Sequence, residues 1–239
     1  MVTFGRFSWR IDALLVAVMG FLSACAYTGA DEGFYKPVTR KLTWFSYVAG
    51  DDIRQQCAAF VQDQYRLVYN GVYDEQIRAY HFVGSGESGR YNLRIQVTEE
   101  ADLSSLDTEQ ASPDLLQPWR PRESSTNLPQ RDFELFVRAL KSSKFFDSVP
   151  PTEKLPSIGF YWVVSGCTAN KFHINAYLWP SKRYLNIVFP KLLNAWDFTG
   201  IPINPPRETS NFSIYGTNYE EEFRNHFTLE FGRDGLLRH

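Results

Sequence analysis

The sequence has few histidines and cysteines, and this scarcity limits the chemistry it can carry. Only four of its 239 residues are histidine and three are cysteine. None of the histidines lies at metal-ligand spacing from another histidine or from a cysteine, so the sequence predicts no metal site. The histidines are His81, His173, His226 and His239. We expect structural roles for His81 and His173, which lie on predicted strands, although a single sequence leaves open that these two meet in the fold.

An excess of charge of one sign is also missing. The chain has 25 Lys and Arg residues against 27 Asp and Glu residues, a formal net charge of −2. Nucleic-acid binding depends on clustered Lys and Arg side chains, so no nucleic-acid partner is expected. The same balance gives no reason to expect a polybasic membrane patch.

Long hydrophobic runs are absent except near the N-terminus. The apolar run Ala13 to Leu22 is too short to span a bilayer, and it follows Arg6 and Arg10. Small residues then lead into Cys25. A positively charged start, a short apolar core and small residues are typical of a secretory signal peptide.

The four residues Leu22-Ser23-Ala24-Cys25 match the pattern L-[SA]-[AG]-C at every position. The segment therefore resembles a bacterial lipoprotein signal peptide; the alternative is a buried N-terminal helix. The resemblance implies removal of residues 1–24, a diacylglycerol thioether on the Cys25 sulfur and an acyl chain on its amine. Two or three such chains hold a protein stably on a membrane. The next residue is Ala26 rather than an inner-membrane retention aspartate, which implies the periplasmic face of the outer membrane.

Lipidation of Cys25 would leave two cysteines, Cys57 and Cys167. In an oxidising periplasm the simplest expectation is one disulfide between them. The alternative is a pair of unpaired, buried thiols.

Runs of strands with segregated helices favour an α+β fold with antiparallel sheets. We predict a lipidated tether over residues 25–40 and a single domain over residues 41–239. The domain would hold two helix-plus-three-strand units, in possible halves 41–98 and 132–239. A long loop over residues 99–131, which contains four prolines, would separate them.

The expected elements follow apolar periodicity and turn residues. The first unit has a helix over 51–61 and strands over 65–69, 76–83 and 91–98. The second has a helix over 132–146 and strands over 159–167, 172–179 and 184–189. A short helix from Pro190 to Trp196, strands over 212–215 and 227–231 and a helical piece over 219–225 complete the list.

Two motifs have bland explanations. The glycines of Gly84 to Gly89 match G-x-G-x-x-G, but a strand follows where a dinucleotide site needs a helix, so we expect a hairpin loop and no cofactor. Two carboxylate clusters could in principle form a catalytic pair, but we prefer simpler roles. Asp51 and Asp52 are placed to begin a helix, where carboxylates interact favourably with the helix dipole, and Glu220 to Glu222 are expected on a solvent-exposed face.

Aromatic residues make up 16% of the chain, which is typical of a β-rich core but also offers stacking surfaces for sugars or lipids. Alternation places four residues on one strand face: His173, Asn175, Tyr177 and Trp179. This face could contact a ligand or partner, or it could pack beneath a loop, which we favour.

The sequence therefore favours a lipid-anchored periplasmic accessory or binding protein of the bacterial cell envelope, without catalysis. The membrane would be contacted through the lipid anchor, and an envelope protein would be a further partner. The alternative is an envelope enzyme that acts on cell-wall or lipid substrates, with a site assembled from scattered His, Asp and Glu residues.

Overall fold

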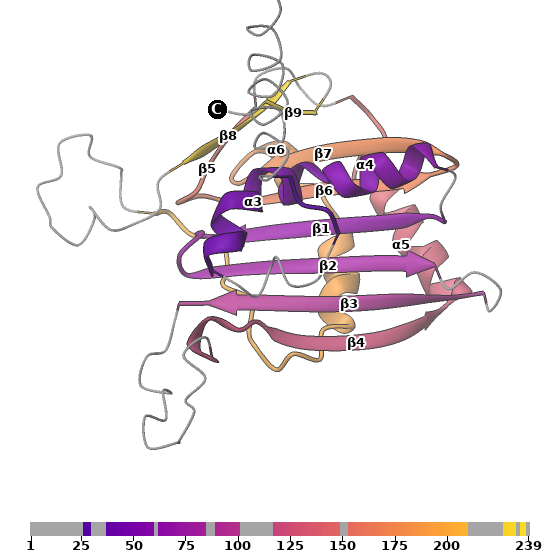
Figure 1. Ribbon diagram of the computed structural model, residues 1–239, viewed down its shortest axis with the longest axis horizontal. Helices are drawn as coiled ribbons and strands as arrows, with labels where there is room; N and C mark the ends of the chain where they lie inside the picture. Colours follow the sequence, from indigo (N-terminus) through magenta and orange to yellow (C-terminus); the bar gives the residue numbers. More distant parts are fainter. Residues whose placement is uncertain are drawn as a thin grey trace, which may run out of the picture.

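The computed structural model describes residues 26–29, 37–59, 62–84, 89–100, 117–148, 153–209, 227–232 and 235–237. A six-stranded antiparallel sheet dominates this part of the chain, in the order β4-β3-β2-β1-β6-β7 (Figure 1). Its strands are β1 (Gln64–Gly71), β2 (Gln76–Gly84), β3 (Arg90–Glu99), β4 (Arg122–Pro129), β6 (Phe160–Thr168) and β7 (Lys171–Leu178). A small antiparallel sheet consists of β5 (Glu153–Pro156), β8 (Thr228–Gly232) and β9 (Gly235–Leu237). The predicted α+β class with antiparallel sheets is confirmed.

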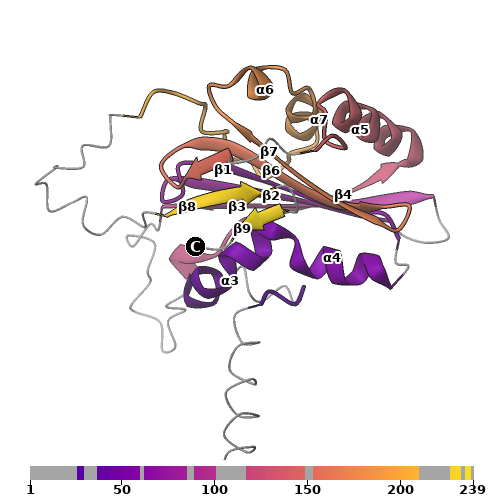
Figure 2. The same cartoon turned by 90° about the horizontal axis from the view of Figure 1, so that it is seen from above.

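Helices cover both faces of the main sheet (Figure 2). On one face lie α3 (Pro37–Ala49) and α4 (Asp51–Ala58), with the small sheet beside them. On the other lie α5 (Gln130–Ser142), α6 (Lys182–Leu185) and α7 (Phe189–Ala195). Among the described residues, no helix is long and apolar enough to cross a membrane.

The larger core lies between the sheet and α5 with α7. Phe133, Phe136 and Leu140 form the predicted stripe on α5 and are buried, and Phe136 stacks on Phe82 of β2 with ring centroids 4.0 Å apart. A second core lies under α3, where Trp44, Tyr47 and Val48 point at the sheet at the spacing of one helical face.

An extended segment, residues 197–207, crosses the α5 face of the sheet and is called the strap here. Arg78 of β2 holds it, because this fully buried guanidinium donates to the Asp197 carboxylate and to the Ile201 carbonyl. Asn204 of the strap is bound as well, through Gln76 and the Gly71 carbonyl.

The α3–α4 junction sits tightly on the sheet at Gly50. This residue has φ 67°, in the left-handed region that favours glycine. A Cβ atom there would lie 2.6 Å from the Ser165 Oγ of β6. Asp51 and Asp52 then occupy the first turn of α4, as the sequence predicts, where carboxylates interact favourably with the helix dipole.

Several predicted boundaries need correction. The predicted loop over 99–131 contains a short 3₁₀ helix (Gln117–Trp119) and the whole of β4, and residues 101–116 lie outside the described part. The strand predicted over 184–189 is wrong: α6 and the start of α7 occupy it, because the Ser181 side chain accepts from the Tyr184 N–H and begins a helical turn. The elements predicted over 212–215 and 219–225 are outside the described residues.

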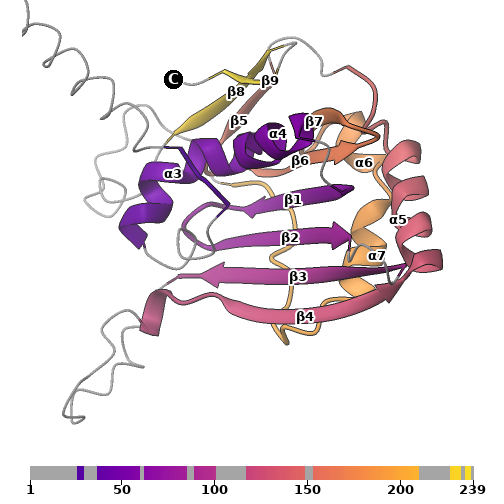
Figure 3. The same ribbon diagram turned by 45° about the vertical axis from the view of Figure 1, so that its right-hand side comes forward.

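The two predicted helix-plus-three-strand units are not independent sheets. The first is extended by β4, and the second lacks its third strand and gains β5. Strand β1 pairs with β6 over its whole length, so one continuous sheet draws strands from both sides of the predicted boundary (Figure 3). Within the predicted tether, residues 26–29 pack against the domain and residues 37–40 are the first turn of α3.

Candidate functional site

A polar row crosses the face of the sheet that carries α3 and α4. Five residues lie in register across five neighbouring strands, β6, β1, β2, β3 and β4; in that order they are Ser165, Arg66, His81, Arg94 and Ser125. Directly opposed residues in a sheet share a face and contact each other. The row therefore joins residues that lie far apart in the sequence, and it ends at the edge strand β4.

Arg66 is the buried centre of this row. Its guanidinium donates two hydrogen bonds to the Asp52 carboxylate, at 2.8 and 2.6 Å, and one to the Tyr47 carbonyl at 2.9 Å. Arg66 and Asp52 are 3% and 5% exposed. A bidentate pair with a further carbonyl acceptor satisfies a buried guanidinium well and fixes its orientation. Arg66 thus ties the α3–α4 junction to β1.

His81 lies beside Arg66 and is neutral. Burial lowers its pKa well below the ordinary value, and the neighbouring Arg66 and Arg94 lower it further. The Arg66 Nε–H can only donate, so His81 Nδ1, 3.4 Å away, accepts. The ring proton is then on Nε2, which donates to the Tyr47 hydroxyl oxygen at 2.7 Å. Burial raises the pKa of Tyr47, so neither group is a base poised for proton abstraction.

Tyr27 covers this cluster from outside. Its ring meets the Tyr47 ring edge to face at 4.9 Å and lies 5.0 Å from the Arg66 guanidinium carbon. The Tyr27 N–H donates to Ser46 Oγ, and the Ser46 hydroxyl donates to the Asp51 carboxylate. Tyr27 is 7% exposed. The N-terminal segment 26–29 is therefore docked on the domain, through a cation–π contact with Arg66 and an aromatic contact with Tyr47.

Beyond His81 the same face is polar and is not covered by α3 or α4 (Figure 1). We call the side chains of β3 and β4 on this face the polar strip. Arg94 donates to Glu123 at 3.2 Å, Gln96 donates to the same carboxylate, and Asn92 donates to Ser125 at 3.0 Å. The polar strip consists of Asn92, Arg94, Gln96, Glu123, Ser125 and Asn127. Gln96 is buried, whereas Glu123, Ser125 and Asn127 of β4 are exposed to solvent.

A hollow of about 420 Å³ lies where β3 ends and β4 begins. Its walls carry carboxylates, guanidinium groups and one indole, a set that can bind a polar ligand with charges of both signs. The lining residues are Val97, Glu99, Glu100, Gln117, Pro118, Trp119, Arg120, Pro121 and Arg122.

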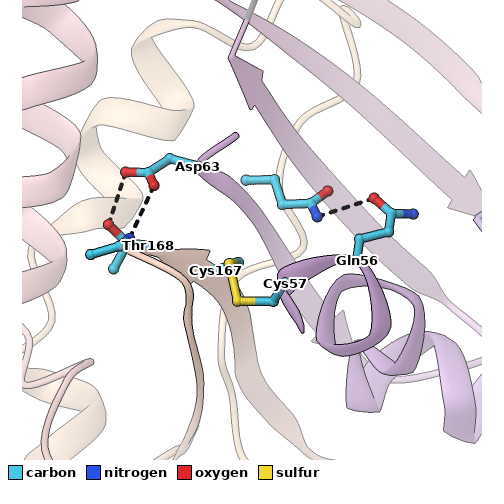
Figure 4. Close-up of a disulfide and its surroundings, with 7 residues drawn as sticks. Gln56, Cys57, Asp63, Cys167 and Thr168 are labelled. Carbon is cyan, nitrogen blue, oxygen red and sulfur yellow. Dashed lines mark hydrogen bonds between the residues drawn. A yellow bond between two sulfur atoms is a disulfide. The ribbon is translucent and has the colours of Figure 1, made fainter. Parts of the chain in front are cut away.

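The predicted disulfide is present between Cys57 of α4 and Cys167 of β6, whose Cα atoms are 5.5 Å apart (Figure 4). Hydrogen bonds flank it on both sides: Gln64 donates to Gln56, and the Thr168 hydroxyl donates to Asp63. The bond fastens α4 to the face that carries Arg66. It therefore fixes α4 to β6, the strand that carries Ser165 at one end of the polar row.

The predicted polar-aromatic face of β7 lies on the opposite side of the sheet, beneath the turn that follows α5. Asn175 is fully buried and donates to the carbonyls of Lys144, Phe145 and Asp147. His173 packs edge-on against Phe146, and burial, helped by Lys171, lowers its pKa.

The other two residues of this face are also in contact. Tyr177 is fully buried against Phe189, and burial raises its pKa. Trp179, just after β7, meets Phe160 edge to face. His173 and Asn175 therefore lie beneath the turn that follows α5, whereas Tyr177 contacts α7 and Trp179 contacts β6.

Sequence reasoning placed Asn92, Arg94 and Gln96 on one strand face, but it did not bring the polar row or the polar strip together across strands. One signal was available: Gln64, Arg66 and Asn70 interrupt an otherwise apolar strand, and a polar residue at a position that points into a domain needs a partner. Cys25, the predicted lipidation site, lies outside the described residues. Within the described ranges, no three His, Cys, Asp or Glu side chains cluster closely enough to hold a metal ion.

No protein-family model matches the chain, and neither a curated protein nor a solved structure shows significant similarity to it.

Proposed function

We propose that this protein is a lipid-anchored accessory or binding protein on the periplasmic side of a bacterial cell envelope, without catalysis. The observation that carries the proposal is the match of Leu22 to Cys25 to the lipobox, directly after a short apolar run that follows two arginines. The anchor is the acylated Cys25, and the absence of an aspartate after it favours the outer membrane. The Cys57–Cys167 disulfide supports the proposal because such bonds persist in oxidising compartments.

The contact surface in this proposal is the polar strip, with the hollow at its end. Its strands are the part of the main sheet that neither α3 nor α4 covers (Figure 1). Its side chains include Arg and Asn donors beside a Glu acceptor. The opposite face of the same strands is buried in the core. Side chains on a rigid sheet keep fixed positions, so they are suited to bind a partner of matching shape and polarity.

The histidine chemistry supports a binding role over the envelope-enzyme alternative. A catalytic histidine is commonly oriented by a carboxylate, which stabilises its charged form. His81 instead lies between two arginines, which lower its pKa, and both of its ring nitrogens are engaged with Arg66 and Tyr47.

The anchor is tested by metabolic labelling with an alkynyl fatty acid, followed by membrane fractionation. Wild type should be labelled and membrane-bound. Cys25→Ala should lose the label and leave the membrane, because the short apolar run then acts as an ordinary signal peptide. Ser23→Ala is the matched control, since alanine fits the lipobox at that position and labelling should persist. Labelling of Cys25→Ala at the wild-type level would refute the proposal.

The absence of catalysis is tested separately. The purified acylated protein is incubated with peptidoglycan fragments and with phospholipid vesicles, and products are sought by mass spectrometry. We expect both substrates to be unchanged. A product that disappears in a His81→Gln variant would establish the enzyme alternative.

A further inference from the structure

We infer that the lipid anchor leaves the folded domain at the α3–α4 face and holds the polar strip against the zwitterionic headgroup layer of the bilayer. The inference rests on the proposed acylation of Cys25 and names the partner of the polar strip. Its basis is the docking of Tyr27 on the folded domain.

The first step is covalent reach. Cys25 is two residues before Tyr27, and two residues of fully extended chain span about 7 Å. Tyr27 is held at three points: by its ring on Tyr47, by its ring over Arg66 and by its N–H on Ser46. The Cα atom of an acylated Cys25 therefore lies within about 7 Å of the Tyr27 Cα atom, so the backbone leaves the domain little room to stand clear of the bilayer.

The second step is direction. The segment 26–29 lies on the same side of the sheet as α3 and α4, and the α5–α7 layer lies on the opposite side (Figure 2). Tyr27 contacts Arg66 and Tyr47, and Tyr47 contacts His81. From His81 the row continues to Arg94 and Ser125, two strands away and about 10 Å along the sheet. The bilayer nearest to the anchor therefore faces the polar strip.

The third step is chemistry. The polar strip consists of amide, hydroxyl, guanidinium and carboxylate groups, so it is suited to headgroups rather than to acyl chains. Arg94 offers a planar donor for a phosphate and Glu123 an acceptor for an ammonium group. Asn92 and Asn127 supply further amides for either group. A surface of this kind lies on the headgroups without insertion.

The test uses the acylated protein in vesicles of the zwitterionic lipids phosphatidylethanolamine and phosphatidylcholine, which contain a headgroup-spin-labelled lipid. Cys57 and Cys167 are bridged and Cys25 is acylated, so a single introduced cysteine is the one free thiol for a fluorescent label. Ser125→Cys places the label on the polar strip. Asn194→Cys, an exposed position on α7, is the matched control on the opposite side. We expect quenching at position 125 and none at position 194.

A second variant tests the role of the docked segment without disturbing the domain. A ten-residue Gly-Ser linker between Ala26 and Tyr27 has a root-mean-square length of about 17 Å, which lets the domain leave the bilayer while Tyr27 stays docked. Quenching at position 125 should then be lost, with acylation unchanged. Quenching that survives the linker would overturn the inference, as would equal quenching at both positions in the protein without the linker.

The two proposals fail in different ways. Absence of fatty-acid label on Cys25 refutes the proposed function, whatever the quenching shows. Normal acylation with no quenching at position 125 refutes this inference alone. Protection of that thiol from maleimide in cells, together with no quenching in vesicles, would assign the polar strip to a protein partner instead of the membrane.

Discussion

The buried ion pair between Arg66 and Asp52 gives the sharpest prediction about stability. Asp52→Ala removes the acceptor of two short hydrogen bonds and leaves a guanidinium that is 3% exposed with the Tyr47 carbonyl and two aromatic rings around it. Breaking a buried pair by removing one partner costs about 3–5 kcal/mol, because the other charge stays uncompensated. We therefore expect a loss of this size in the free energy of unfolding.

The expected loss is large enough to measure. Natural domains are stable by about 5–15 kcal/mol. For a domain of this size, each kcal/mol shifts the melting temperature by about 2–4 °C, so Asp52→Ala should melt roughly 6–20 °C below wild type. The assay is urea and thermal unfolding of the mature chain, with the disulfide intact, followed by tryptophan fluorescence and circular dichroism.

Two further variants separate the possible causes. Lys154→Ala breaks the ion pair between Lys154 and Glu230, in which the Lys154 side chain is 65% exposed. This change should lower the free energy of unfolding by less than about 1 kcal/mol. The double variant Asp52→Leu with Arg66→Met replaces the pair by apolar side chains and should be more stable than Asp52→Ala, because no charge is stranded. The reasoning is refuted if Asp52→Ala costs no more than Lys154→Ala, or if the double variant is the less stable of the two.

The remaining predictions concern His81 and the disulfide. Because the folded-state pKa of His81 lies below its unfolded value of about 6.5, the unfolded chain binds the extra proton first, and stability should fall as the pH drops below about 6.5, by at most about 1.4 kcal/mol per pH unit. Urea midpoints at pH 7 and pH 5 check this, and His81→Gln should show a smaller pH dependence; an equal dependence would contradict the assignment. Reduction of the Cys57–Cys167 bond, which spans 110 residues, should lower the stability by about 4–5 kcal/mol in the loop-entropy model, and the unfolded, unreduced protein should have no reactive thiol at either position. Two reactive thiols before reduction would show that the bond does not form.

Local sequence patterns predicted most of the sheet. Strands β1, β2, β3, β6 and β7 each show alternating or continuous apolar residues between turn signals. The β6–β7 hairpin turns at Ala169 and Asn170, both with positive φ, where the sequence placed its connection. Alternating apolar residues indicate a strand that is buried on one face, and a continuous apolar run indicates a strand that is buried on both faces.

The missed elements are those whose stability comes from distant partners. Strand β4 is polar on the face that forms the polar strip, and on the other face Leu128 is its one fully buried apolar side chain. Its formation depends on pairing with β3, across a segment that reads as a Pro-rich loop. The apolar residues of 184–189 look like a strand, but the Ser181 cap sets a helical turn instead. Tertiary context overrides weak local preference in both cases.

The candidate site depends on register, which one sequence does not reveal. Arg66, His81 and Arg94 meet because three neighbouring strands pair in one particular alignment. A shift of one residue in any pairing would turn its side chains to the other face. Tyr27 adds a contact from a segment that composition alone assigned to a tether.

Two buried arginines on adjacent strands hold the α3–α4 junction on one face of the sheet and the strap on the other. Arg66 of β1 binds the carboxylate of Asp52 and a carbonyl at the end of α3, and Arg78 of β2 binds the carboxylate of Asp197 and a carbonyl of the strap. Each arginine donates a hydrogen bond to a carbonyl outside the main sheet, which apolar packing cannot do. Each also accepts one docking geometry, since the planar guanidinium fixes the directions of its hydrogen bonds. On the Arg66 side this specificity extends to Tyr27, so the arginine that orders the α3–α4 junction also determines where the membrane anchor would leave the domain.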